Sequence, residues 1–368
     1  MIYFHNKNDL LIFGCYKGGA GMFDQEVIFK VERKTGWIIL NRSKALNALS
    51  LNMVKKIREQ LHIWAKDESI VLICIKSNIE KAFCSGGDVR SIHDHKNNNL
   101  LPFAKDFFSI EYDMDLLIHE YSKPILAYMN GIVMGGGVGI SAGSNFRIVT
   151  ENTKWAMPEM NIGFFPDVGA SYFLNQMPGY IGTYLALTAK TIKADDLLHV
   201  GAADYYLKST KWTELEAWIN EQNWESKTVF ITLQEKLKTV CSNQDVLEPV
   251  LNEGKINRHF QWETLEEIVD SLQENEQQGD IWAKNIKEEM LLKSPTSLKV
   301  TLEHLRRTKG KTKKECFQMD EVLAMKFMGT SDFFEGVRAV LVDKDQNPTW
   351  NPPTIDKVSS SFVEQFFV

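Results

Sequence analysis

An α/β fold with a helical C-terminal region is the architecture that the sequence predicts, and three observations predict it. Short apolar runs typical of buried strands alternate with segments whose apolar residues recur at helical spacing. Glycine clusters at 86–87 and 135–137 mark turns from a strand into a helix. After about residue 210, long helical stretches rich in Glu, Lys and Gln replace these units. We therefore expect an N-terminal extension (1–21), a core (22–210) and a mainly helical region (211–368).

The expected strands lie in the first half of the chain. The runs 27–32 and 37–40 flank Lys34-Thr35-Gly36, which is the pattern of a hairpin. An uninterrupted apolar run at 71–75 is typical of a strand buried on both faces. Further strands are expected at 125–129 and 146–149.

The expected helices begin at recognisable caps. Ser50 is placed to cap a helix with apolar residues at helical spacing, and a second amphipathic segment covers 103–119. Shorter helices are expected at 180–187 and after residue 192, the latter capped by Asp195 or Asp196. In the last third we expect helices at 213–223, 265–275 and 280–292, and one that Ser294 caps and that runs through Leu305.

Composition argues against several classes of protein. The 368 residues, 44% of them hydrophobic, are enough to fill a sizeable core. A net charge of −6 argues against a nucleic-acid or acidic-membrane surface. The five cysteines have no CxxC or Cys/His spacing, so we expect neither a disulfide framework nor a metal site. Without an apolar run of roughly 18 residues or a signal-like start, the sequence predicts a cytoplasmic protein.

The loop 155–169 is the strongest candidate for chemistry. It places Glu159 and Asp167 among aromatic residues, prolines and glycines, which break any regular period. Burial there would raise the pKa of a carboxyl group and make it a usable acid or base near neutral pH. Either residue alone could instead cap a helix or pair with an arginine. Two acids downstream of three consecutive glycines favour catalysis.

The three glycines at 135–137 let backbone N–H groups approach a ligand oxygen at the start of a small-residue helix. A dinucleotide fingerprint is not indicated, because no acidic residue follows a second strand at the usual spacing. The turn at 81–90 would by itself be a plain strand-to-helix connection.

In combination, these motifs resemble the crotonase (enoyl-CoA hydratase/isomerase) superfamily. The segments that carry the resemblance are KALNAL at 44–49, AFCSGGD at 82–88, the glycines at 131 and 135–137, and MPE with a glycine four residues later at 157–163. Over roughly 25–355 the chain resembles the 3-hydroxyisobutyryl-CoA hydrolase branch of this superfamily, through GFFPDVG at 163–169, SPTS at 294–297 and EGVRA at 335–339.

The resemblance implies a spiral of ββα units that binds an acyl-CoA, with the thioester oxygen held by the N–H groups of Gly87 and Gly136. Losing one such donor typically costs about 3–4 kcal/mol of transition-state stabilisation. The resemblance adds further substrate-binding positions at Glu111, Lys44, Leu46, Ser85 and Asp88. No metal or redox cofactor is implied, since coenzyme A is part of the substrate, and a homo-oligomer is possible.

One departure from the hydratase pattern points to hydrolysis. Hydratases of the superfamily carry a glutamate just after the three glycines and a second one twenty residues later, whereas this chain has Gly139 and Glu159. Adding water to a double bond needs both carboxylates. We therefore expect a thioester hydrolase for a short branched 3-hydroxyacyl-CoA, with Glu159 as nucleophile or base and Asp167 contacting the 3-hydroxyl or assisting proton delivery. The alternatives are a hydratase or isomerase, and a catalytically silent acyl-CoA-binding or assembly protein.

Overall fold

The computed structural model describes residues 25–241 and 249–368, so the expected extension 1–21 lies outside the described residues. Two sheets form the framework, and in each of them parallel pairing dominates, with β1 and β2 as the antiparallel exception. The larger sheet has the order β1 (Val27–Glu32), β2 (Thr35–Leu40), β3 (Leu72–Ser77), β5 (Ile125–Met129), β7 (Phe146–Val149) and β9 (Tyr205–Tyr206). The smaller sheet has the order β4 (Ala82–Cys84), β6 (Ile132–Met134) and β8 (Lys154–Ala156).

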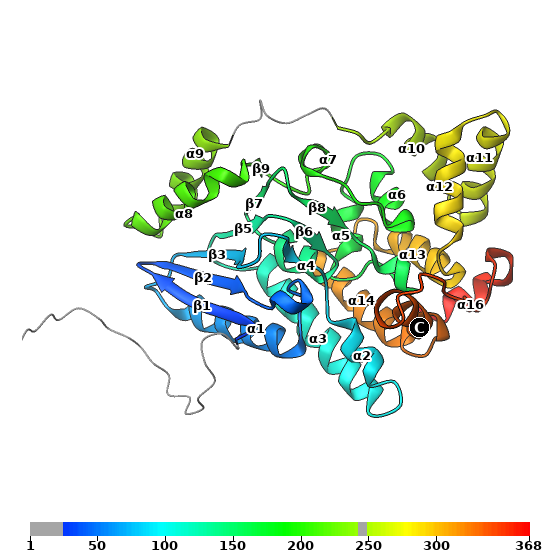
Figure 1. Cartoon of the computed structure of the whole chain (residues 1–368), viewed down its shortest axis with the longest axis horizontal. Coiled ribbons are helices and arrows are strands. Elements are labelled where there is room, and N and C mark those ends of the chain that lie inside the picture. The colour runs from blue at the N-terminus through cyan, green and yellow to red at the C-terminus, as the bar shows by residue number, and fades with distance from the viewer. Residues whose placement is uncertain (1–24, 242–248) are drawn as a thin grey trace, which may run out of the picture.

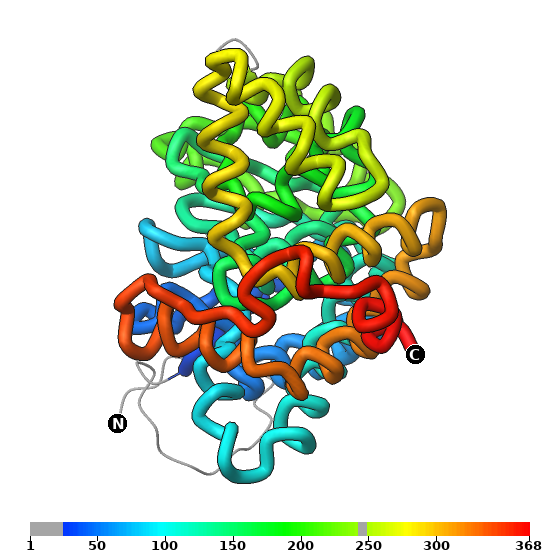
Figure 2. Tube along the Cα trace, turned by 90° about the vertical axis from the view of Figure 1, so that its right-hand side faces the viewer, coloured from blue at the N-terminus to red at the C-terminus, as the bar shows by residue number. Residues whose placement is uncertain are grey.

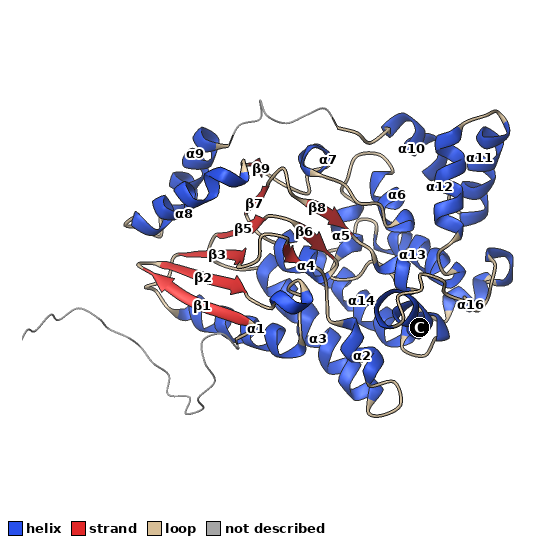
Figure 3. Cartoon of the chain, viewed as in Figure 1, coloured by secondary structure: helices blue, strands red, loops and turns tan. Residues whose placement is uncertain are grey.

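Successive ββα units explain the two sheets. From β3 onward, the first strand of each pair joins the larger sheet and the second joins the smaller one. The expected spiral is thereby confirmed. Figure 3 shows the strands in the left and central parts of the view, while helices and loops alone form its right-hand side.

The helices follow the chain in this order: α1 (Leu51–Lys66), α2 (Val89–Asp94), α3 (Leu100–His119), α4 (Gly136–Ala142), α5 (Ala170–Leu174), α6 (Ile181–Thr188), α7 (Ala194–His199), α8 (Trp212–Glu221), α9 (Val229–Val240), α10 (Glu253–Phe260), α11 (Leu265–Gln277), α12 (Ile281–Leu291), α13 (Pro295–Thr308), α14 (Lys313–Phe327), α15 (Ser331–Val337) and α16 (Ser360–Glu364). Three short turns matter as well: η1 (Ser43–Ala45), η2 (Glu159–Ile162) and the π-helical turn η5 (Arg338–Val342).

Helices cover both faces of the larger sheet, as strands with continuous apolar runs require. On one face α8 and α9 pack against side chains such as Trp37 and Tyr128, and Trp212 stacks on Tyr128 with ring centroids 3.8 Å apart. On the other face α1 and α3 share a core with the smaller sheet. In Figure 1, α8 and α9 lie above the larger sheet and α1 below it.

The C-terminal helices pack against the first half of the chain. Helix α14 contacts α3, and α15 contacts both α2 and η2. Figure 2 shows this orange and red segment beside the blue and cyan N-terminal half. Because α8 and α9 pack on the sheet, the residues after 210 do not all lie apart from the core. The boundary near residue 210 stays a prediction.

Most predicted elements are present within a few residues of their expected bounds. Ser50 caps α1 by accepting a hydrogen bond from the backbone N–H of Met53, and Ser294 caps α13. The predicted acidic cap of α7 is wrong: its N-cap is Lys193, with no side-chain cap bond. Asp196 instead accepts hydrogen bonds from the backbone N–H groups of Val250 and Leu251, because a chain segment distant in sequence lies against it.

Candidate active site

The site is assembled at the carboxyl ends of the smaller sheet. Strands β4, β6 and β8 are parallel, so the loops that follow them leave the sheet on the same side. These loops are 85–88, 135–137 and 157–169, the three motifs that the sequence singled out. They open into a cavity of about 530 Å³. All the predicted site residues line it: Lys44, Leu46, Ser85, Gly87, Asp88, Glu111, Gly136, Glu159 and Asp167.

Two backbone donors lie side by side in this cavity. A Cβ atom added to Gly136 would stand 3.0 Å from the backbone nitrogen of Gly87. Within the described residues, neither the Gly87 nor the Gly136 N–H has a hydrogen-bond acceptor. Gly135, with φ +49° and ψ −120°, makes the sharp turn that presents Gly136 at the start of α4. The pair is therefore placed to bind an oxygen atom of a ligand.

Two glutamates flank the glycine run so closely that no larger residue fits. A Cβ atom at Gly135 would stand 2.6 Å from Oε1 of Glu159, and one at Gly136 would stand 2.5 Å from Oε1 of Glu111. Glu111 therefore lies next to both donor glycines, since a Cβ atom at Gly87 would also stand 3.4 Å from its Oε1, whereas Glu159 lies next to the neighbouring Gly135. Glu159 comes from η2, whereas Glu111 comes from the middle of α3.

Burial sets the protonation of these carboxyl groups. Glu159 and Glu111 are 7% and 2% exposed, and burial together with the nearby charge of Asp167 raises the pKa of each well above its ordinary value. Asp167 is also buried, which raises its pKa to about 7, although a 2.6 Å hydrogen bond from the hydroxyl of Tyr112 acts in the opposite direction. The site thus holds carboxyl groups able to exchange protons near neutral pH.

Asp115 belongs to the same cluster but was not singled out from the sequence. It lies one turn after Glu111 on α3, is fully buried, and neither of its carboxyl oxygens has a hydrogen-bond partner in the described residues. A Cβ atom at Gly139 would stand 2.4 Å from Oδ2 of Asp115 and 2.9 Å from Cβ of Val168. The space beside Gly139 is therefore occupied, and no carboxylate side chain fits at that position without displacing Asp115.

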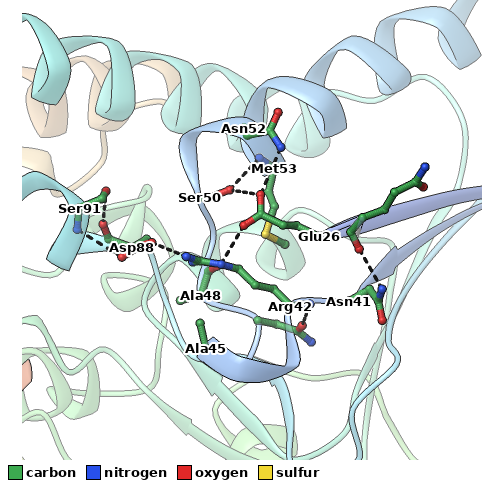
Figure 4. A network of polar contacts seen from close by, with 12 residues as sticks. Glu26, Asn41, Arg42, Ala45, Ala48, Ser50, Asn52, Met53, Asp88 and Ser91 are labelled. Carbon is green, nitrogen blue, oxygen red and sulfur yellow. Dashed lines mark hydrogen bonds and ion pairs between the residues drawn. The ribbon is translucent and has the colours of Figure 1, made fainter. Parts of the chain in front are cut away.

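A polar network holds the rim of the cavity (Figure 4). Arg42 forms ion pairs with Glu26 at 2.9 Å and with Asp88 at 2.8 Å. Asp88 also caps α2 by accepting from the backbone N–H of Ser91. Asp88 therefore stabilises the local structure, in addition to its predicted contact with substrate. Ser85 likewise donates to the carbonyl oxygen of Ala45, which ties the β4 loop to η1.

The rim also presents Lys44 and Leu46. Both side chains are exposed, and Lys44 has no ion pair within the described residues. A positive charge at the mouth of a cavity attracts an anionic ligand.

The C-terminal segment forms part of the cavity wall, which local sequence patterns did not predict. Val340, Leu341 and Lys344 line it, although they follow the rest of the site by about 170 residues or more. They are held there by α15, where a Cβ atom at Gly336 would stand 2.3 Å from the backbone carbon of Ile162 in η2. The EGVRA motif was the one sequence signal in this region.

In the described part of the chain, no group of three or more His, Cys, Asp and Glu residues is arranged to hold a metal ion. The expectation that no metal and no further cofactor is needed stays a prediction.

Comparison with known proteins agrees with the motifs. The model of the enoyl-CoA hydratase/isomerase family matches residues 35–367. A mitochondrial 3-hydroxyisobutyryl-CoA hydrolase of Danio rerio is 42% identical over 346 residues, which are 93% of this chain and 89% of the relative. The small ribosomal subunit protein mS47 of Neurospora crassa is 36% identical over 96% of this chain and 73% of its own length.

Among solved structures, a carnitinyl-CoA dehydratase of Mycobacterium thermoresistibile is similar with a TM-score of 0.85. It is 31% identical, with 94% of this chain and 97% of that one covered. The family model, the relatives and this shared fold agree with the resemblance that the motifs carry. The chain belongs to the enoyl-CoA hydratase/isomerase family.

Proposed function

We propose that this protein is a thioester hydrolase that converts 3-hydroxyisobutyryl-CoA to 3-hydroxyisobutyrate and coenzyme A, a step of valine breakdown. The observation that carries the proposal is that the Glu159 carboxyl group, next to Gly135, lines the same cavity as the two unengaged N–H groups of Gly87 and Gly136. A thioester carbonyl bound to these donors has a carboxylate within reach of its carbon atom. Relatives with this activity in their names, at about 40% identity, support the choice.

In the proposed reaction, the N–H groups of Gly87 and Gly136 stabilise the negative charge that forms on the carbonyl oxygen. Glu159 either removes a proton from the attacking water or attacks the carbon itself, giving an anhydride that water then cleaves. In both routes the first tetrahedral intermediate collapses with cleavage of the C–S bond, which in the second route is the step that forms the anhydride. The leaving thiolate takes up the proton that Glu159 removed from water or, in the second route, a proton from solvent. Because its pKa is raised, Glu159 is a stronger base, once ionised, than an exposed glutamate.

Asp167 is proposed to contact the 3-hydroxyl group of the substrate or to assist the proton delivery. Tyr112 fixes the orientation of its carboxyl group through the 2.6 Å hydrogen bond. One oxygen of Asp167 is thus engaged, and the side chain still lines the cavity. Glu111, next to Gly136, is proposed as a further contact with the substrate.

A hydratase or isomerase is the alternative within enzymes. The geometry around Gly139 counts against it, because Asp115 and Val168 occupy the space that a second catalytic glutamate would need. Glu111 and Asp167 supply carboxyl groups from other directions. Loss of unsaturation without release of thiol would identify this alternative.

A non-catalytic role is the alternative from another class, and the relative named as a ribosomal subunit protein makes it concrete. Glu159, Asp167 and both donor glycines are nevertheless present and lie together in one cavity. A protein that only binds or assembles would not need buried carboxyl groups beside free N–H donors, since burying them costs stability.

Location and assembly stay predictions. A cytoplasmic location is expected from cysteine usage, whereas the Danio rerio relative is named as a mitochondrial protein, and cell fractionation separates these two outcomes. None of the helices in the described residues combines the length and the apolar character needed to cross a membrane.

Replacing Glu159 tests the mechanism. Glu159→Gln keeps the shape of the side chain but removes the base or nucleophile, so kcat for thiol release should fall by at least about 100-fold. The matched control is Glu120→Gln, an exposed carboxylate at the end of α3, which should retain wild-type turnover. Thiol release at the wild-type rate by folded Glu159→Gln protein would remove Glu159 from the mechanism.

A further inference from the structure

A second cavity of about 460 Å³ lies at the other end of α4 from the active site. Gly136, the first residue of α4, lines the active cavity, whereas Val138, Ser141 and Ala142 line the second one. The two cavities have no lining residue in common. The ends of α3 and α7, the first residue of α14, and parts of β7, β8 and α5 complete its wall.

The polar part of this wall is cationic. Arg147 and Lys313 line the cavity, and no Asp or Glu does. Arg147 is already engaged, because its guanidinium donates to both carboxylate oxygens of Asp204 at 2.7 and 3.0 Å. Lys313 lies 5.6 Å from the centre of the Tyr172 ring and has no carboxylate partner within the described residues. Its ammonium group is therefore the positive charge available to a ligand.

Two neutral hydrogen-bonding side chains face the same space. Ser144 is 7% exposed and lines the cavity, and its hydroxyl oxygen has no hydrogen-bond partner in the described residues. His119 lies at the end of α3, where burial and the charges of Lys313 and Arg147 lower its pKa to about 4. The ring is therefore neutral at pH 7 and offers one N–H donor. The ring of Phe317 is its aromatic neighbour, at 5.9 Å.

Trp155, Phe173 and Met177 add an apolar and aromatic part to the wall, next to the polar side chains of Ser141 and Gln176. A cavity that combines an unpaired ammonium and free donors with aromatic and apolar side chains fits an anion with an apolar body. We propose that this cavity is a second ligand site that binds a small organic carboxylate, whose charged group lies between Lys313, His119 and Ser144. The site is independent of the proposed hydrolysis.

Isobutyrate is a suitable probe, and isobutyramide is its uncharged counterpart of nearly the same shape. Calorimetry on the full chain should show isobutyrate binding at least about tenfold more tightly than isobutyramide, because a hydrogen bond to a charged group is worth more than one to a neutral group. Lys313→Gln should weaken isobutyrate binding by at least about tenfold, whereas Lys314→Gln, its exposed neighbour, should leave it unchanged.

The titration of His119 separates this site from the active cavity. A carboxylate beside the imidazole favours its charged form, so NMR of the labelled ring should show the pKa of His119 rising from about 4 when isobutyrate is added. In Lys313→Gln the rise should require correspondingly more isobutyrate. An unchanged His119 titration at saturating isobutyrate, or equal binding of acid and amide, would overturn the proposal.

Discussion

Asp115 is a single buried residue that determines which side chains fit beside Gly139. Its carboxyl group fills the space beside Gly139 and lies among the charges of Glu111, Asp167 and Asp320. Burial and these charges raise its pKa well above the ordinary value, so the neutral form is the one that the fold accommodates. The hydrolase geometry thus depends on a residue outside the recognised motifs.

Replacing Asp115 by Asn tests this electrostatic account. The folded-state pKa is raised, so the contribution of Asp115 to stability is complete below its unfolded-state pKa and is lost as the pH rises through the folded-state pKa. Asp115→Asn cannot ionise, and it should therefore melt at a higher temperature than wild type at pH 8, with the difference shrinking at pH 5. Calorimetry at the two pH values measures this.

The control for this experiment lies on the same helix. Asp113 is exposed and pairs with Arg58, so Asp113→Asn should show little change of melting temperature relative to wild type at either pH. A difference between Asp115→Asn and wild type that is the same at pH 5 and pH 8 would contradict the assigned burial of a titrating carboxyl group.

Site residues could be predicted from the sequence where the composition of the surrounding loop set them apart. Glu159 and Asp167 stood out because proline, glycine and aromatic residues surround them, and the structure buries both as expected. Asp115 gave no comparable signal, since an acid within a predicted amphipathic helix is normally assigned to the solvated face. Only its spacing of four residues from Glu111 indicated a shared face.

Among the elements, the loop that carries Glu159 is held by its contact with α15. Gly163 ends η2 with φ +64°, and a Cβ atom there would stand 2.5 Å from the carbonyl oxygen of Asp332. Asp332 in turn accepts a 2.6 Å hydrogen bond from the hydroxyl of Ser294, the N-cap of α13. Two segments far apart in sequence are thus fixed against the turn that carries Glu159.

A methyl group at Gly336 should separate these elements. Gly336→Ala places a Cβ atom 2.3 Å from the backbone of Ile162, so overpacking should cost about 1–3 kcal/mol of stability and lower kcat through displacement of Glu159. Gly254→Ala in α10 is the matched control, because its added Cβ atom meets nothing nearer than 3.8 Å. Denaturant unfolding and thiol-release kinetics compare them, and equal stability and turnover of the two variants would contradict this contact.

Elements were predictable where local chemistry fixes them. The caps at Ser50 and Ser294 and the glycine turns follow from short-range hydrogen bonding and backbone freedom. The cap of α7 was not, because Asp196 is engaged by backbone groups of residues 250 and 251. A local pattern holds no information on such a distant partner.

At the scale of the whole molecule, the C-terminal segment completes a site that the N-terminal half begins. Val340, Leu341 and Lys344 line the same cavity as Lys44 and the donor glycines. The sequence predicted a helical region after 210, which is present, but not its return to α2 and α3. The contacts of α14 with α3 and of α15 with α2 depend on packing between helices far apart in sequence, and the periodicity of apolar residues does not predict such pairs.

The proposed function requires that this cavity hydrolyses a 3-hydroxyacyl thioester and does not hydrate a double bond. The most direct test compares the full chain on two substrates, 3-hydroxyisobutyryl-CoA and crotonyl-CoA, following free thiol and loss of the enoyl absorbance in parallel. We predict rapid thiol release from the first and near inertness toward the second, because Gly139 supplies no carboxylate and Asp115 occupies its space. Efficient hydration of crotonyl-CoA without thiol release would contradict the account.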